Sequence, residues 1–283
     1  MDRNWRRNVV FRKGWRSLSI PRRWLSNLIE HPTPGRLPVL ANSIPKSGTH
    51  LLLQVLKALP GIRDWGLFLA SQPSFTFVEQ DPGRMAAKIS KMANGELAGA
   101  HLHHHQAIAQ AVEDRDALMY FIYRDPRDVV VSEAHYLAHM NSWHRLHDQF
   151  KHQPDENARL RLAIEGLPAS EGINYPDVGT RLARYLPWLD HPGILAVRYE
   201  DLVGKAREEQ VRRIVAHWKT ATGFKGDVSG LHQSALDSIN PLTSHTFRLG
   251  RAGGWRDAMN QELKTLFQRN AHAQLQRMGY EDP

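Results

Sequence analysis

The sequence predicts an α/β fold: a single P-loop-type domain with a central parallel sheet flanked by helices. Short apolar runs alternate with segments of helical periodicity, and this alternation is typical of parallel sheets. A turn of small residues joins the first apolar run to the first helical segment, as in phosphate-binding folds. The length of 283 residues and the hydrophobic content of 41% suit one α/β domain with a sizeable core.

The expected strands and helices follow one another along the chain. The first strand is the run LPVLANSI, which covers residues 38–43 and extends just beyond, and the first helix is GTHLLLQVLKAL at 48–59, before the stop signal Pro60-Gly61. Further strands are expected at 97–102, 117–123 and 194–199. Further helices are expected at 127–140, 180–189, 205–221 and 258–278.

Charge divides the chain into a basic arm, residues 1–30, and a domain, residues 31–283. Residues 1–24 contain eight Arg or Lys and one Asp, which accounts for +7 of the net charge of +8. The domain is therefore close to neutral, and we expect no nucleic-acid partner. Aromatic residues among the arginines could bring the arm to an anionic membrane surface, but a solvated or packing arm is the simpler interpretation.

Two segments of the domain lack a regular pattern. Residues 141–179 are polar and weakly periodic, and we expect an irregular excursion near the mouth of the site. Residues 243–257 are rich in glycine and arginine and are expected to form a lid over an anionic ligand. The chain has no cysteine, which excludes a disulfide framework and a cysteine nucleophile. With no signal-peptide pattern or long apolar run either, we expect a cytoplasmic protein.

The segment PKSGTH, residues 45–50, carries the first chemical signal. Unpaired N–H groups and the helix dipole make the start of the first helix an anion site, which Gly48 lets a ligand approach closely. Lys46 precedes the glycine, so the Walker A pattern is not met and a nucleotide-hydrolysing enzyme is disfavoured. A capped helix start without ligand is the alternative for this segment alone.

Two later segments place more cations where ligands bind. In YRDPRDVVVSEAHY, residues 123–136, Arg124 follows a strand and Ser132 lies about two helical turns further on. In FRLGRAGGWR, residues 247–256, Arg248 and Arg251 lie among glycines. Each segment by itself is also compatible with an ordinary surface element.

Taken together, IPKSGTH, YRDPRDVVVS and RLGRAGGWR resemble, in order and spacing, the phosphosulfate-binding segments of the sulfotransferases. VRYEDL, residues 197–202, also resembles a stretch common in that family, and the resemblance runs from about residue 38 to the C-terminus. It implies transfer of a sulfuryl group from 3′-phosphoadenosine-5′-phosphosulfate (PAPS), with 3′-phosphoadenosine-5′-phosphate (PAP) as product and no metal.

The resemblance also implies roles for individual residues. The 5′-phosphosulfate would be bound by Lys46, Ser47, Gly48, Thr49 and His50. The 3′-phosphate would be bound by Arg124, Ser132, Arg248 and Gly250. Tyr199 would lie near the adenine, and Leu51 and Leu249 stand where cytosolic members usually carry an adenine-stacking tryptophan and a lysine. Lys46 would stabilise the leaving phosphate and His101 would act as the general base.

Several alternatives remain open beside this reading. A nucleotide-binding module without catalysis is disfavoured by Lys46 and His101, and a P-loop kinase by the missing Walker lysine. His101, His103 and His105 could share one face of a strand, but such spacings are usually not metal sites. The acceptor is expected to be a small molecule or glycolipid with a hydroxyl or amine, and a homodimer is compatible with the sequence. Aromatic residues at 65–77 could line the acceptor site or belong to the core.

Overall fold

The computed structural model describes residues 35–168, 172–240 and 252–280. Its centre is a five-stranded sheet in the order β2-β3-β1-β4-β5, in which every neighbouring pair is parallel. The strands are β1 (Val39–Ser43), β2 (Arg63–Ala70), β3 (Glu96–His101), β4 (Leu118–Tyr123) and β5 (Leu195–Arg198). The α/β fold class with a central parallel sheet is therefore confirmed.

Helices connect the strands and cover both faces of the sheet. The α-helices are α2 (Thr49–Lys57), α3 (Pro82–Ser90), α4 (Gln106–Asp114), α5 (Pro126–His135), α6 (His147–Lys151), α7 (Glu156–Glu165), α8 (Val178–Ala183), α9 (Tyr199–Val203), α10 (Arg207–Thr222), α11 (Val228–Asp237), α12 (Trp255–Ala258) and α13 (Gln261–Arg277). A π-helical turn, η2 (Tyr136–Met140), follows α5, and a 3-10 helix, η4 (Leu186–Leu189), follows α8. Within the described residues, no helix is long and apolar enough to cross a membrane.

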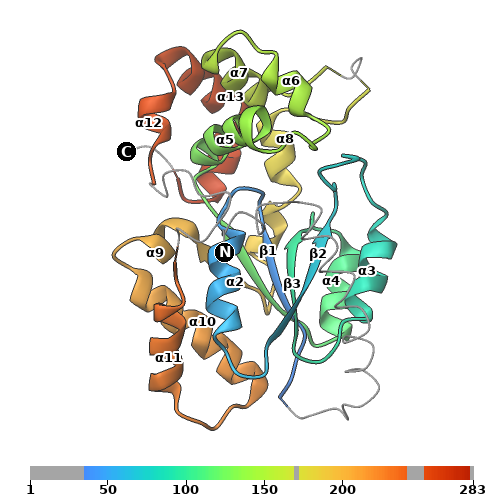
Figure 1. The fold of residues 1–283 in the computed structure, drawn as a ribbon, viewed down its shortest axis with the longest axis vertical. Coiled ribbons are helices and arrows are strands. Elements are labelled where there is room, and N and C mark those ends of the chain that lie inside the picture. Colours follow the sequence, from blue (N-terminus) through green and yellow to red (C-terminus); the bar gives the residue numbers. More distant parts are fainter. Residues whose placement is uncertain (1–34, 169–171, 241–251, 281–283) are drawn as a thin grey trace, which may run out of the picture.

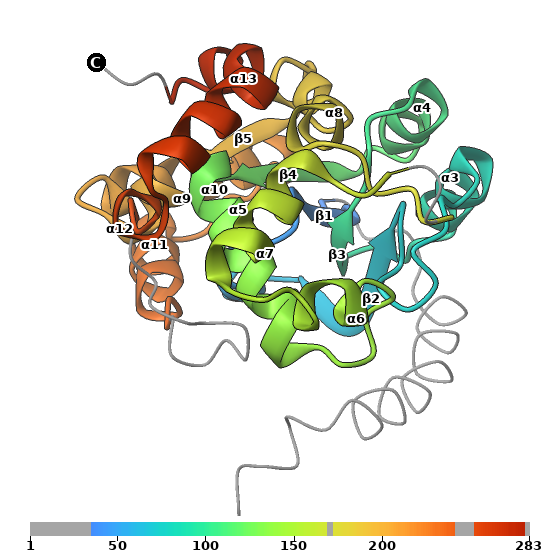
Figure 2. The same cartoon turned by 90° about the horizontal axis from the view of Figure 1, so that it is seen from above.

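Side chains of the strands alternate between two apolar layers, as successive residues of a strand must. On β4, Tyr120 and Ile122 pack with α2 and α10, whereas Met119 and Phe121 face the layer that includes α3, α4 and α5. Seen from above, α3 and α4 lie on one side of the molecule and α10 and α11 on the other (Figure 2). Both faces of the sheet are therefore buried, which is why its strands read as nearly continuous apolar runs.

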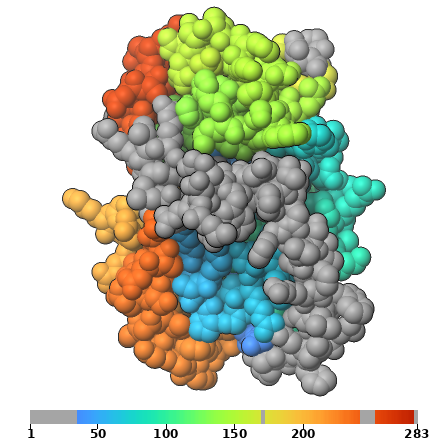
Figure 3. Space-filling model, viewed as in Figure 1, coloured from blue at the N-terminus to red at the C-terminus, as the bar shows by residue number. Residues whose placement is uncertain are grey.

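A layer of helices covers the carboxyl ends of the strands. Helices α5 to α8, α12 and α13 lie above the strands in Figure 1. In the space-filling view the segment holding α5 to α7 lies above the segment holding α2 (Figure 3). Residues that follow the carboxyl ends of the strands therefore lie between the sheet and this layer, where ligands bind in open α/β sheets.

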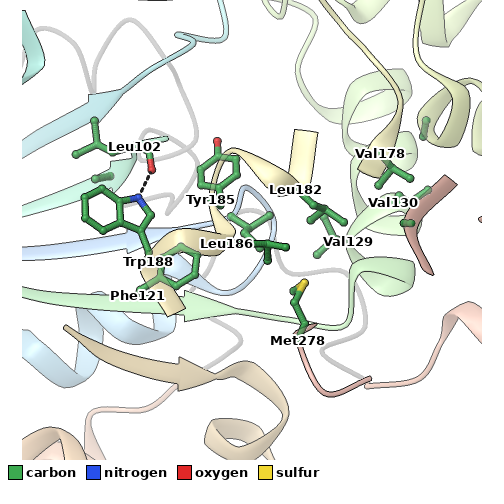
Figure 4. Close-up of a cluster of buried hydrophobic side chains, with 14 of the residues drawn as sticks. Leu102, Phe121, Val129, Val130, Val178, Leu182, Tyr185, Leu186, Trp188 and Met278 are labelled. Carbon is green, nitrogen blue, oxygen red and sulfur yellow. Dashed lines mark hydrogen bonds between the residues drawn. The ribbon is translucent and has the colours of Figure 1, made fainter. Parts of the chain in front are cut away.

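The segment after β3 is anchored in the core. The fully buried Trp188 donates its indole N–H to the Leu102 carbonyl at 2.9 Å, as Figure 4 shows. The Asn42 side chain also bonds both the N–H and the carbonyl of Leu102, at 2.8 and 3.2 Å. These bonds fix the backbone directly beyond His101, so that side chain extends from a rigid base.

Three sequence expectations differ from the structure. Strand β2 was not expected, because it is a half-buried edge strand with a register shift between Arg63 and Leu67. The expected irregular excursion at 141–179 contains helices α6 and α7 and the start of α8. The single helix expected at 180–189 is instead α8 followed by η4, which contains Pro187 in its first turn. The arm, 1–30, lies outside the described residues, as does most of the expected lid at 243–257.

Candidate active site

The turn between β1 and α2 contains two residues with left-handed backbone angles. Lys46 has φ 68° and Gly48 has φ 97°. Glycine adopts such angles freely, whereas a residue with a Cβ pays roughly 1–2 kcal/mol for them. Backbone strain of this kind concentrates at functional sites. The strained residue here is the lysine that the sequence singled out.

An unsatisfied polar group lies in the same turn. Ser47 is fully buried, and its hydroxyl has no hydrogen-bond partner among the described residues. Leaving such a group unpaired costs about 1–3 kcal/mol. The hydroxyl lies just ahead of the N-terminus of α2, where unpaired backbone N–H groups also favour an anion. The residues of the turn therefore fit a bound phosphate or sulfate group.

The Lys46 ammonium lies over an aromatic ring from the covering helical layer. Its Nζ is 3.8 Å from the centroid of the Tyr136 ring, in η2. Burial lowers the pKa of Lys46 from 10.5 to about 8, an effect opposed by the nearby Glu133 carboxylate and reinforced by Arg124. The cation thus lies in a poorly hydrated position, where its interaction with an anion is stronger than in water.

His101 ends β3 and contacts the end of β1. Its Nδ1 lies 3.2 Å from the Ser43 carbonyl and 3.0 Å from the Ser43 hydroxyl, which in turn is 2.6 Å from the hydroxyl of Thr49. A carbonyl oxygen only accepts hydrogen bonds, so the bond assigns the proton to Nδ1. The other ring nitrogen, Nε2, then has a free electron pair and can accept a proton.

The surroundings of His101 keep it neutral. Burial lowers its pKa from 6.5 to about 4, partly offset by the bond to the Ser43 carbonyl, and the nearby His50 and Lys46 lower it further. The ring of Phe68, on β2, packs edge-on against it with centroids 4.9 Å apart. A histidine in this state can accept a proton at neutral pH, and its ring lies beside the Phe68 side chain.

Arg124 and the turn meet at Tyr199. The guanidinium of Arg124 lies 4.5 Å from the centroid of the Tyr199 ring. A Cβ added to Gly48 would come within 2.5 Å of the same ring. The structure therefore brings together Arg124, Tyr199 and Gly48, three residues that the sequence placed in one site.

The remaining expected site residues are less directly connected. Ser132 is half-buried on α5, and Leu51 is 4% exposed and belongs to the apolar layer with α2 and α10. Leu51 thus contributes its side chain to the core. Arg248, Leu249 and Gly250 lie outside the described residues.

The other histidines near His101 have separate partners. His103 Nδ1 contacts the Glu79 carboxylate at 2.7 Å, and His105 caps α4 by accepting from the Ala107 N–H at 3.2 Å. In the part of the chain that the structure describes, no group of three or more His, Cys, Asp or Glu side chains is placed to hold a metal ion.

Sequence reasoning missed three residues of the site: Ser43, Tyr136 and Asp128. Ser43 is a polar residue at the end of an apolar strand, and this position could have identified it as a candidate site residue. Asp128 lies in the first turn of α5, four residues after Arg124, which precedes that helix, and Arg124 Nη2 is 3.2 Å from Asp128 Oδ2. Tyr136 and Lys46 are ninety residues apart in the sequence, so no local sequence pattern indicates their contact.

Comparison with known proteins identifies a protein family and several similar structures. The family model of the sulfotransferase domain matches residues 38–279. No curated protein matches the chain. Mouse sulfotransferase SULT7A1 complexed with PAP has a similar structure, with 17% identity, a TM-score of 0.55, and coverage of 92% of this chain and 93% of that chain.

Two structures of retinol dehydratase are also similar, each with a TM-score of 0.55. The complex with androsterone and the inactive cofactor PAP is 15% identical and covers 90% of this chain and 85% of that chain. The complex with retinol and PAP is 16% identical and covers 89% of this chain and 84% of that chain. At these identities the likeness concerns the fold.

Proposed function

The chain belongs to the sulfotransferase family, and we propose that this enzyme transfers a sulfuryl group from PAPS to a hydroxyl or amine of a small-molecule or glycolipid acceptor. The observation that carries the proposal is the turn before α2, where the strained Lys46 and the unpartnered Ser47 hydroxyl lie at a helix N-terminus. An ammonium group, a hydroxyl and unpaired backbone N–H groups, all of which can bind an anion, lie together in this turn. PAP in the similar structures supports the same nucleotide for this chain.

In the proposed reaction, His101 acts on the acceptor and Lys46 acts on the leaving phosphate. The acceptor oxygen forms a bond to sulfur while the bond between sulfur and the bridging phosphate oxygen breaks. Nε2 of His101 accepts the acceptor proton, and Lys46 stabilises the negative charge that develops on the leaving phosphate. Arg124 and Ser132 bind the 3′-phosphate, and Tyr199 lies near the adenine. No step of this scheme requires a metal.

The acceptor is proposed from the surroundings of His101. Phe68 packs against the imidazole and is 37% exposed, so an apolar group can lie beside the base. Retinol dehydratase was crystallised with retinol and with androsterone, which makes apolar alcohols the first acceptors to test. A glycolipid acceptor, membrane contact through residues 1–30, a homodimer and a cytoplasmic location are further proposals.

Incubation with labelled PAPS and a panel of alcohols, phenols, amines and glycolipids tests the proposal. Transfer of label to an acceptor, with release of PAP, is the expected result. PAP binding without transfer to any acceptor would favour a nucleotide-binding module, and transfer from ATP instead would favour a kinase.

The pH dependence of kcat/KM should have two limits. His101 must be neutral to accept a proton, so activity should fall below its pKa of about 4. Lys46 must be protonated to stabilise the leaving phosphate, so activity should fall above its pKa of about 8. The profile of kcat/KM reports the free enzyme, to which both values apply. Because arginine stays charged, Lys46→Arg should remove the alkaline limit in whatever activity it retains. An alkaline limit that Lys46→Arg leaves in place would contradict the assignment.

Replacement of Gly48 should damage nucleotide binding. In Gly48→Ala the positive φ alone costs roughly 1–2 kcal/mol of unfolding free energy, and the new Cβ displaces the Tyr199 ring. We expect PAP affinity to fall, measured by calorimetry. Gly223→Ala is the matched control, because Gly223 also has a positive φ of 65° but open space around it. It should lose similar stability and bind PAP normally; equal PAP affinity in both variants would contradict the contact with Tyr199.

A further inference from the structure

Asp128 connects two distant parts of the chain through both of its carboxylate oxygens. It lies in the first turn of α5 and is 3% exposed. Its Oδ2 accepts from Arg124 Nη2 at 3.2 Å and from the Gly253 N–H at 2.8 Å. Its Oδ1 accepts from the Trp255 N–H at 2.9 Å. One side chain thus binds the arginine after β4 and the backbone that leads into α12.

We propose that Asp128 is a positioning residue for nucleotide recognition, which holds Arg124 and the backbone at 253–255 in the arrangement that binds the 3′-phosphate. The proposal rests on the proposed function, in which Arg124 binds that phosphate. Asp128 itself need not touch the nucleotide.

The guanidinium of Arg124 is held on two sides. Asp128 binds its edge, and the Tyr199 ring lies 4.5 Å from its central carbon on one face. An arginine has five N–H donors in one plane, so a bond at one edge and a contact on one face set the direction of the remaining donors. A side chain already fixed in this way loses less conformational entropy when it binds an anion.

Charge alone predicts the opposite contribution from Asp128. A carboxylate beside a phosphate-binding arginine cancels part of its charge, and its removal should then strengthen phosphate binding. Positioning predicts that removal weakens binding. The sign of the effect therefore separates the two contributions.

The chain offers a matched control in the same helical turn. Asp125 is also buried, and its carboxylate bonds Arg127 Nε and Nη2, both at 2.9 Å. Arg127 donates to the Tyr280 carbonyl at 3.1 Å and lies 3.8 Å from the centroid of one Trp255 ring. This pair supports the same elements but does not include Arg124.

The experiment compares PAP with adenosine 5′-phosphate, which lacks the 3′-phosphate, by calorimetry on the full chain. In Asp128→Asn the amide cannot accept all three hydrogen bonds, and we expect PAP affinity to fall about tenfold or more, as for a lost charged hydrogen bond. Affinity for adenosine 5′-phosphate should stay within about twofold, since the β1–α2 turn is untouched. Asp125→Asn should lower Tm and leave the ratio of the two affinities unchanged.

The outcomes are distinct. Unchanged or tighter PAP binding by Asp128→Asn overturns the proposal, and so does an equal loss for both nucleotides, which indicates general damage to the fold. A wild-type protein that does not prefer PAP over adenosine 5′-phosphate overturns the proposed binding of the 3′-phosphate by Arg124 instead.

Hydrogen exchange on the unmodified protein gives a second test if Asp128→Asn does not fold. The Gly253 and Trp255 N–H groups bond the same carboxylate as Arg124. PAP should therefore slow amide exchange at residues 253 and 255, and adenosine 5′-phosphate should not. Equal slowing by both nucleotides, or by neither, overturns the proposal.

Discussion

Lys46→Met should lower kcat by roughly 10²–10³-fold, the usual effect of removing one group that stabilises transition-state charge. Methionine retains most of the apolar stem of lysine but cannot place a charge over the Tyr136 ring. The loss should be larger for kcat than for PAP affinity, because the proposed charge on the leaving phosphate grows only as the bond to sulfur breaks. Single-turnover kinetics with saturating PAPS measure this step directly.

Lys57→Met is a control for this substitution. Lys57 ends α2 and forms a surface ion pair with Asp64 at 3.3 Å, away from the turn. Such pairs contribute little, typically below about 1 kcal/mol, and the variant should turn over normally. If Lys46→Met keeps wild-type kcat, Lys46 has no role at the leaving group.

His101→Gln should lower kcat by roughly 10²–10⁴-fold, the range for loss of a general base. Glutamine is of similar size and can still bond Ser43, but it cannot take up a proton at Nε2. The variant should bind PAP with near-normal affinity, because the proposed base acts on the acceptor and not on the nucleotide. The measurement is kcat with a hydroxyl acceptor, beside calorimetric titration with PAP.

His103→Gln is the matched control, since His103 lies two residues away and bonds Glu79. It should retain most of the activity. A similar loss of kcat in both variants would indicate that the histidines act on the local structure, and unchanged kcat in His101→Gln would exclude it as the base.

The sequence predicted those parts of the fold whose pattern is local. Strands β1, β3 and β4 are buried on both faces and read as nearly continuous apolar runs. Strand β5 also reads as a short apolar run, although only Val197 is buried. Strand β2 has a glycine at position 66 with φ 78° and is only partly buried, so its pattern is broken. Helix α7 buries only Leu160, Ala163 and Ile164 among charged neighbours, which is too weak a pattern to identify it.

The candidate site shows the same division between local and long-range information. Lys46, Arg124 and Tyr199 each follow a strand, and that position is visible in sequence. The direction of each side chain depends on contacts that sequence spacing does not reveal. Ser43 meets His101 across 58 positions, and Asp128 meets Gly253 across 125. These contacts exist only once the sheet has brought its strand ends together.

The Tyr199 ring is a neighbour of both the turn at Gly48 and the Arg124 guanidinium, so the two proposed anion-binding positions share one aromatic side chain. Under the proposed function, a shift of this ring would change the distance between the two positions. A ligand with two anionic groups at that distance would engage both positions, and a ligand with a shorter or longer distance would lose one of them. Selectivity for such a ligand would then depend on the packing of an uncharged ring as well as on the cations.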